Sequence, residues 1–175
     1  EIAYAQRPED PYWGIDDLAS RVAGPHARGL RVLVRVDYEQ QQSLPPTDDY
    51  VALAEYLAYV RRVLRDDRLR NIYGFIIGSD YNTYDASASV PNRATTPAWY
   101  ARIFSGYGED PAHADNVLQI ARAENAQARI IVGPLRPWAS DQTGSLEYGG
   151  PDVPWLRYMN TLVAYLDEAA QSKAA

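Results

Sequence analysis

The sequence predicts an α/β protein in which four consecutive βα units carry parallel strands. Short runs rich in apolar and β-branched residues occur at 2–5, 31–38, 72–78 and 128–132, and a stretch with helical signals follows each of them. Regular alternation of strands and helices is typical of a parallel sheet with right-handed crossovers.

The individual strands are expected from their patterns. In the run 31–38 the residues Val32, Val34 and Val36 alternate with more polar ones, which indicates a strand with one strongly apolar face. The run 72–78 is almost wholly apolar, as expected for a strand covered on both faces.

Capping residues mark the expected helix starts. Asp16 or Asp17 is predicted to cap the first helix, residues 47–49 to begin the second, and Pro97 to occupy the first turn of the third. The helices are then expected at about 16–27, at 50–64, from about 98 to an interruption at 107–110, from about 112 to 125, and at 154–170.

Loop lengths extend this prediction to the architecture. The loops that follow strands are long, polar and rich in aromatic residues, whereas those that follow helices are short. Active-site loops of a TIM (β/α)8 barrel show this asymmetry, and an open flavodoxin-like sheet is the alternative. Because a complete barrel takes roughly 250 residues, we interpret residues 1–175 as a single α/β domain, a fragment of a larger barrel. Exposed sheet edges and apolar helix faces then predict self-association or a partner chain that completes the barrel.

Composition argues against several classes of function. A net charge of −6 argues against a nucleic-acid partner, and the absence of cysteine excludes disulfides and thiol nucleophiles. No apolar run is long enough for a membrane span, and no glycine-rich phosphate loop or histidine cluster suggests a cofactor or a metal site. Fourteen tyrosines and four tryptophans, against two phenylalanines, are typical of wet binding clefts.

The segment 77–82, Ile-Gly-Ser-Asp-Tyr-Asn, is the strongest functional motif, since it ends the third expected strand. It resembles the Ile-Gly-Asn-Glu-Pro-Asn motif that ends strand four of retaining glycoside hydrolases of clan A. The segments 29–37 and 128–134 resemble the third and fifth strands of that family. The resemblance implies that Asp80 occupies the position of the general acid/base and that Ser79 replaces the Asn that holds the sugar 2-hydroxyl.

The motif also departs from the family. Aspartate is one methylene shorter than glutamate, and the two carboxyl groups of a retaining site lie roughly 5–5.5 Å apart. The family's nucleophile, a Glu at the end of strand seven, has no counterpart in the matched segments, so hydrolysis is not expected from this fragment. The resemblance implies an oligosaccharide or polysaccharide ligand, O-glycosyl hydrolase activity only in a full-length parent, and a secreted or cell-surface location.

Further side chains are expected at the same rim of the sheet. The predicted substrate-binding residues are Asp37, Glu39, Ser79, Tyr81, Asn82, Arg136 and Trp138. Three alternatives stay open at this point: an internal Arg35–Asp37 network, a turn-forming role for Asp80, and aromatic rings that pack under their own loops. The alternative function is a non-enzymatic structural or protein-interaction domain on a barrel scaffold.

Overall fold

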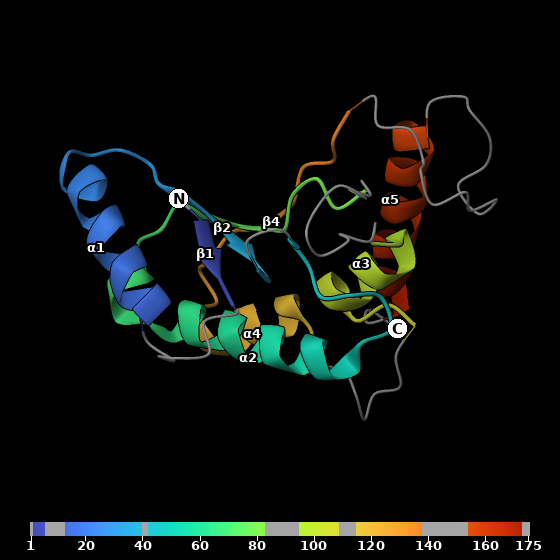
Figure 1. Cartoon of the computed structure of the whole chain (residues 1–175), viewed down its shortest axis with the longest axis horizontal. Helices are drawn as coiled ribbons and strands as arrows, with labels where there is room; N and C mark the ends of the chain where they lie inside the picture. Colours follow the sequence, from blue (N-terminus) through green and yellow to red (C-terminus); the bar gives the residue numbers. More distant parts are fainter. Residues whose placement is uncertain are drawn as a thin grey trace.

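A computed structural model describes residues 2–5, 13–39, 42–82, 95–108, 115–137 and 154–172. Within these ranges strands and helices alternate along the chain (Figure 1). In order, the elements are β1 (Ile2–Tyr4), α1 (Trp13–Ala27), β2 (Leu33–Asp37), α2 (Tyr50–Arg65), a 3₁₀ turn (Asp67–Leu69), β3 (Gly74–Ile77), α3 (Pro97–Ser105), α4 (Val117–Glu124), β4 (Ile130–Val132) and α5 (Pro154–Ser172).

The strands form one parallel sheet in the order β1-β2-β3-β4, which confirms the predicted α/β class. Tyr4 of β1 lies opposite Asp37, and Arg35 lies opposite Ile76, which in turn lies opposite Ile131 of β4. Because every strand runs in the same direction, the loops that follow the strands all leave from one edge of the sheet.

The two faces of the sheet differ in what covers them. Val34 and Val36 of β2, with Phe75 and Ile77 of β3, point into the hydrophobic core and are almost fully buried. Figure 1 shows α2 and α4 side by side beneath the sheet, with α3 and α5 packed together beyond one end of it. Leu33 lies on the opposite face of β2 and remains 40% exposed, so the described helices cover one face only.

Local capping explains where three of the helices begin. The side chain of Asp49 accepts a hydrogen bond from the amide of Ala52 at 2.9 Å and so caps α2. The predicted segment 47–49 therefore holds the cap of this helix. Thr96 caps α3 in the same way and Pro97 occupies its first turn, also as predicted. Asn116 caps α4, which begins later than the expected start of that segment.

The predicted cap of α1 is wrong. The helix begins at Trp13, so Asp16 and Asp17 lie inside it rather than before it. Both carboxylates form ion pairs instead: Asp17 binds Arg21 at 2.8 Å, and Asp16 binds Arg68 of the 3₁₀ turn at 2.7 Å. An acidic residue in a first turn is also favourable to the helix dipole, so residue type alone did not distinguish a cap from a first-turn position.

Gly133 allows the loop after β4 to approach the end of β3. A Cβ atom at this position would lie 2.3 Å from the carbonyl oxygens of both Ile77 and Gly78. Real Cβ atoms do not come so close to backbone oxygens, so one strand end would have to move away from the other. Glycine at 133 is therefore a packing requirement of the sheet.

We expect Gly133→Ala to lower the free energy of unfolding by roughly 3 kcal/mol or more, because the clash is with backbone atoms. Gly29→Ala is the matched control: Gly29 has a φ of 76° and open space around it, so alanine there costs only about 1 kcal/mol of left-handed backbone strain. Denaturant unfolding of both variants measures the difference. Equal destabilisation of the two variants would contradict the requirement.

Candidate carboxyl-edge site

Three loops meet at the carboxyl edge of the sheet and bring the predicted site residues together. Asp37 is the last residue of β2, Ser79 and Asp80 follow β3, and the segment 134–136 follows β4. The amide of Asp80 donates to the carbonyl of Pro134 at 2.9 Å, which joins the second of these loops to the third.

Asp37 forms an ion pair with Arg35 on the face of β2 that the helices leave uncovered. Both Nε and Nη2 of Arg35 bind the same carboxylate oxygen, Oδ2, at 2.9 and 2.8 Å. The other oxygen, Oδ1, is buried and accepts no hydrogen bond among the described residues. The internal Arg35–Asp37 contact, one of the alternatives that the sequence left open, therefore exists, and it satisfies only half of the carboxylate.

This half-satisfied environment changes the acidity of Asp37. Burial raises the pKa of Asp37 to about 6, since the charged form loses its hydration. Arg35 opposes this effect through its charge and hydrogen bond, and the negative charge of Asp80 adds to it. The influence of Asp80 shows that the two carboxyl groups are electrostatic neighbours across the ends of β2 and β3.

Asp80 itself is exposed and adopts a left-handed backbone conformation, with φ of 51°. Aspartate tolerates this region better than most residues, because its short side chain can bond locally. The turn places the backbone of Asp80 against Pro134 and leaves its side chain accessible from solvent. Of the two carboxyl groups, Asp80 is thus the one that a dissolved ligand can reach, since Asp37 is only 3% exposed.

Both polar atoms of the Asn82 side chain form hydrogen bonds within the protein. Its Nδ2 donates to the carbonyl of Arg136 at 3.0 Å, and its Oδ1 accepts from the amide of Arg136 at 2.8 Å. The side chain is buried, with 8% of its surface exposed. Asn82 therefore holds the loop after β4 in place, and Arg136 enters this contact through its backbone.

Tyr81 also lies inside the molecule. Its ring is 3% exposed and stacks on Tyr100 at 4.3 Å between ring centres, and its hydroxyl donates to the carbonyl of Gly133 at 2.9 Å. This position leaves no free ring face for a sugar. Tyr81 therefore follows the alternative in which an aromatic ring packs beneath its own loop.

The remaining predicted residues are placed as follows. Ser79 is buried beside Asp80. Glu39 is half-buried, and its amide donates to the carbonyl of Gln42 at 2.8 Å. Trp138 lies outside the described residues.

Tyr100 is the residue of this region that sequence reasoning missed. Its hydroxyl donates to the carbonyl of Ile77 at 3.0 Å and accepts from the amide of Gly133 at 2.8 Å, so it joins the ends of β3 and β4. Tyr56 of α2 likewise donates to the carbonyl of Val36 at 2.8 Å. The tyrosine-rich composition was the available signal, but composition alone does not distinguish buried tyrosines from those of a wet cleft.

The described residues contain no group of three or more His, Asp or Glu side chains able to hold a metal ion. Within the same ranges, none of the helices combines the length and the apolar character that crossing a membrane requires. Comparison with known proteins adds no relative, since no family model, curated protein or solved structure matches the chain.

The free energy of unfolding should fall as Asp37 ionises. The folded-state pKa of about 6 lies above the ordinary value of 3.8, so the folded state retains the proton longer than the unfolded state. Stability due to this group is therefore complete below 3.8 and is lost as the pH rises through about 6. The full loss amounts to roughly 3 kcal/mol.

Denaturant unfolding of the wild type and of Asp37→Asn across this pH range measures the effect. The stability of the wild type should decline relative to that of the variant as the pH rises, because asparagine cannot ionise. A constant difference between the two proteins would mean that Asp37 titrates normally.

Replacement of Asn82 by Ala should remove both hydrogen bonds to Arg136 and lower the free energy of unfolding by roughly 1–3 kcal/mol. Hydrogen exchange should show faster exchange of the Arg136 amide, which is a local readout of the same contact. Gln127→Ala, at an exposed position, is the control and should leave both quantities unchanged. Retained protection of the Arg136 amide in the Asn82 variant would show that another group holds this loop.

Proposed function

We propose that this chain is a carbohydrate-associated domain whose sheet forms part of a (β/α)8 barrel similar to those of clan A glycoside hydrolases. In this proposal the carboxyl-edge loops contact an oligosaccharide, and Asp80 is the residue that binds a sugar hydroxyl. Ligand binding at the carboxyl edge of parallel strands is the general behaviour of such sheets.

The observation that supports this proposal most is the pair of acidic groups at the ends of β2 and β3. Asp80 is exposed, whereas Asp37 is buried, and its burial raises its pKa to about 6 with a smaller contribution from the charge of Asp80. Two nearby carboxyl groups that differ in burial, and therefore in pKa, are typical of sites that act on polar ligands. Carboxylate oxygens are good acceptors for sugar hydroxyl groups, because hydrogen bonds to charged groups are the stronger ones.

Hydrolysis is not part of the proposal for this chain. A retaining mechanism needs an acid/base and a nucleophile about 5–5.5 Å apart. Asp37 cannot serve as that nucleophile in this arrangement, since its free oxygen is buried and the other oxygen is bound to Arg35. The shorter side chain at position 80 also reaches less far than the family's glutamate.

A second candidate function is a structural or protein-interaction domain without carbohydrate binding. The observation that favours it is the internal use of the motif residues, since Tyr81 and Asn82 hold the strand ends together. The described helices also leave Leu33, on the uncovered sheet face, 40% exposed.

Titration with soluble oligosaccharides of several backbones, followed by amide NMR shifts, separates the two candidates. We expect shifts at Asp80 and its neighbours, and an affinity at least about tenfold lower for Asp80→Asn. Asp48→Asn is a closely matched control, since Asp48 is also exposed and also left-handed, with φ of 64°. If none of the sugars shifts the carboxyl-edge amides, the binding proposal fails and the interaction domain remains.

A further inference from the structure

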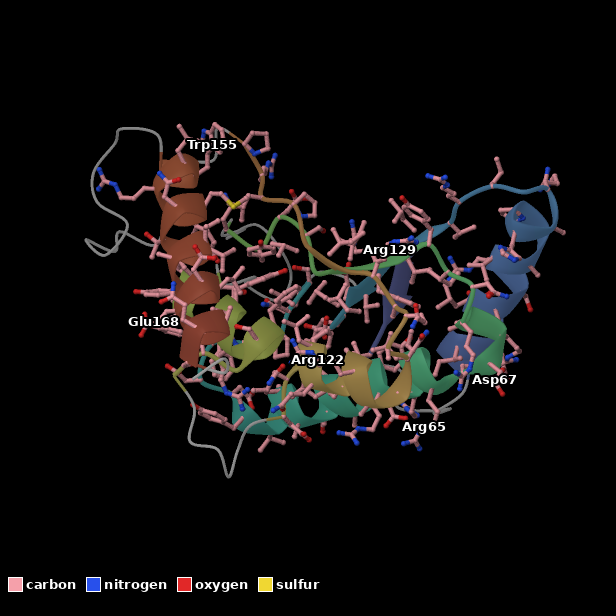
Figure 2. All side chains as sticks on the ribbon, turned by 180° about the vertical axis from the view of Figure 1, so that it is seen from behind. Arg65, Asp67, Arg122, Arg129, Trp155 and Glu168 are labelled. Atoms are coloured by element: carbon pink, nitrogen blue, oxygen red, sulfur yellow. The ribbon has the colours of Figure 1, made fainter. Side chains whose placement is uncertain are left out.

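A cationic cluster lies at the amino edge of the sheet, at the opposite ends of the strands from Asp37 and Asp80. Arg31 precedes β2, Tyr73 precedes β3 and Arg129 precedes β4, so the three residues enter neighbouring strands. The guanidinium carbons of Arg31 and Arg129 lie 4.9 and 4.5 Å from the centre of the Tyr73 ring. In Figure 2, Arg129 lies apart from helices α2 and α4.

Each arginine is held in this cluster by Tyr73. Arg129 donates from Nη1 to the carbonyl of Tyr73 at 3.3 Å, and Arg31 makes a longer contact of 3.5 Å from Nη1 to the tyrosine hydroxyl. Both guanidinium groups lie against the same aromatic ring, and each cation is attracted by the ring electrons.

Among the described residues, neither of these arginines forms an ion pair with a carboxylate. Other exposed arginines of the same acidic chain do: Arg65 binds both oxygens of Glu124 at 2.9 Å, and Arg68 binds Asp66 at 2.7 Å. In the described part of the chain, Arg31 and Arg129 thus bring positive charge to one aromatic ring, and no carboxylate pairs with either of them. A guanidinium presents its N–H donors in a planar fork, which suits oxyanions.

We infer that Arg31, Tyr73 and Arg129 form a binding site for a phosphoryl or sulfuryl oxyanion. A tetrahedral anion offers oxygens in more than one plane, so two guanidinium groups that precede β2 and β4, on either side of β3, can each bind different oxygens of it. The hydroxyl of Tyr73 accepts from Arg31, which leaves its own proton to donate to the same anion. This site is independent of the carbohydrate proposal, since it lies at the other edge of the sheet.

Titration of the wild-type chain with inorganic phosphate, followed by ³¹P and amide NMR, tests the inference. We expect saturable shifts at Arg31, Tyr73 and Arg129, and little response to chloride at matched ionic strength. Methyl phosphate should bind as inorganic phosphate does if the site accepts a phosphate group on a larger molecule. A site for the free ion alone would reject the ester, and acetate should bind more weakly than either.

The variants Arg31→Gln and Arg129→Gln should each weaken phosphate binding by at least about tenfold. Arg122→Gln, at an exposed position of α4, should bind phosphate as the wild type does. Arg129→Lys keeps the charge but loses the planar fork, so it should bind more weakly than the wild type and more tightly than Arg129→Gln. Should a glutamine variant unfold, the lysine variant and the wild-type titration still decide.

Phosphate also stabilises proteins without binding to a site, by exclusion from their surface. A linear, unsaturable response that is equal in the wild type and the Arg31 and Arg129 variants would overturn the inference. Shifts confined to residues outside the three-residue cluster would overturn it as well.

Discussion

Buried tyrosine hydroxyls hold the carboxyl ends of the strands together. Tyr56 binds the carbonyl of Val36, Tyr100 bridges Ile77 and Gly133, and Tyr81 binds the carbonyl of Gly133. The carbonyl of Val36 also accepts from the amide of Gly78 at 3.2 Å. At Ile77 and Gly133 the tyrosine hydroxyls supply partners to buried backbone groups, each of which would cost about 1–3 kcal/mol if it were unsatisfied. Burial raises the pKa of all three hydroxyls, so they remain protonated donors at physiological pH.

The positions of the candidate site residues follow from these contacts. With the ends of β3 and β4 joined, the amide of Asp80 meets the carbonyl of Pro134 and the amide group of Asn82 meets the backbone of Arg136. The close approach at Gly133 belongs to the same arrangement. The exposed carboxylate of Asp80 is therefore carried on a loop that the core itself positions, as a binding residue requires.

The two edges of the sheet have opposite electrostatic character. Asp37 and Asp80 lie at the carboxyl edge, while Arg31 and Arg129 lie at the amino edge. Arg35 moderates the carboxyl edge by pairing with one oxygen of Asp37, but burial still outweighs this pairing in the pKa of that group. In a chain of net charge −6, this separation is the common basis of the two proposals, which assign hydroxyl donors to one edge and oxyanions to the other.

Local patterns in the sequence were enough for the α/β class, the approximate elements, the caps of α2 and α3, and the Arg35–Asp37 contact, because all of these depend on residues a few positions apart. Tertiary packing alone decided that Tyr81 lies under its loop, that Asn82 clamps Arg136, and that Gly133 touches the end of β3. The acidity of Asp37 belongs to the same group, since it depends on burial and on a charge from another strand. Each of these features joins segments that are distant along the chain, and the periodicity of a single segment carries no information about such neighbours.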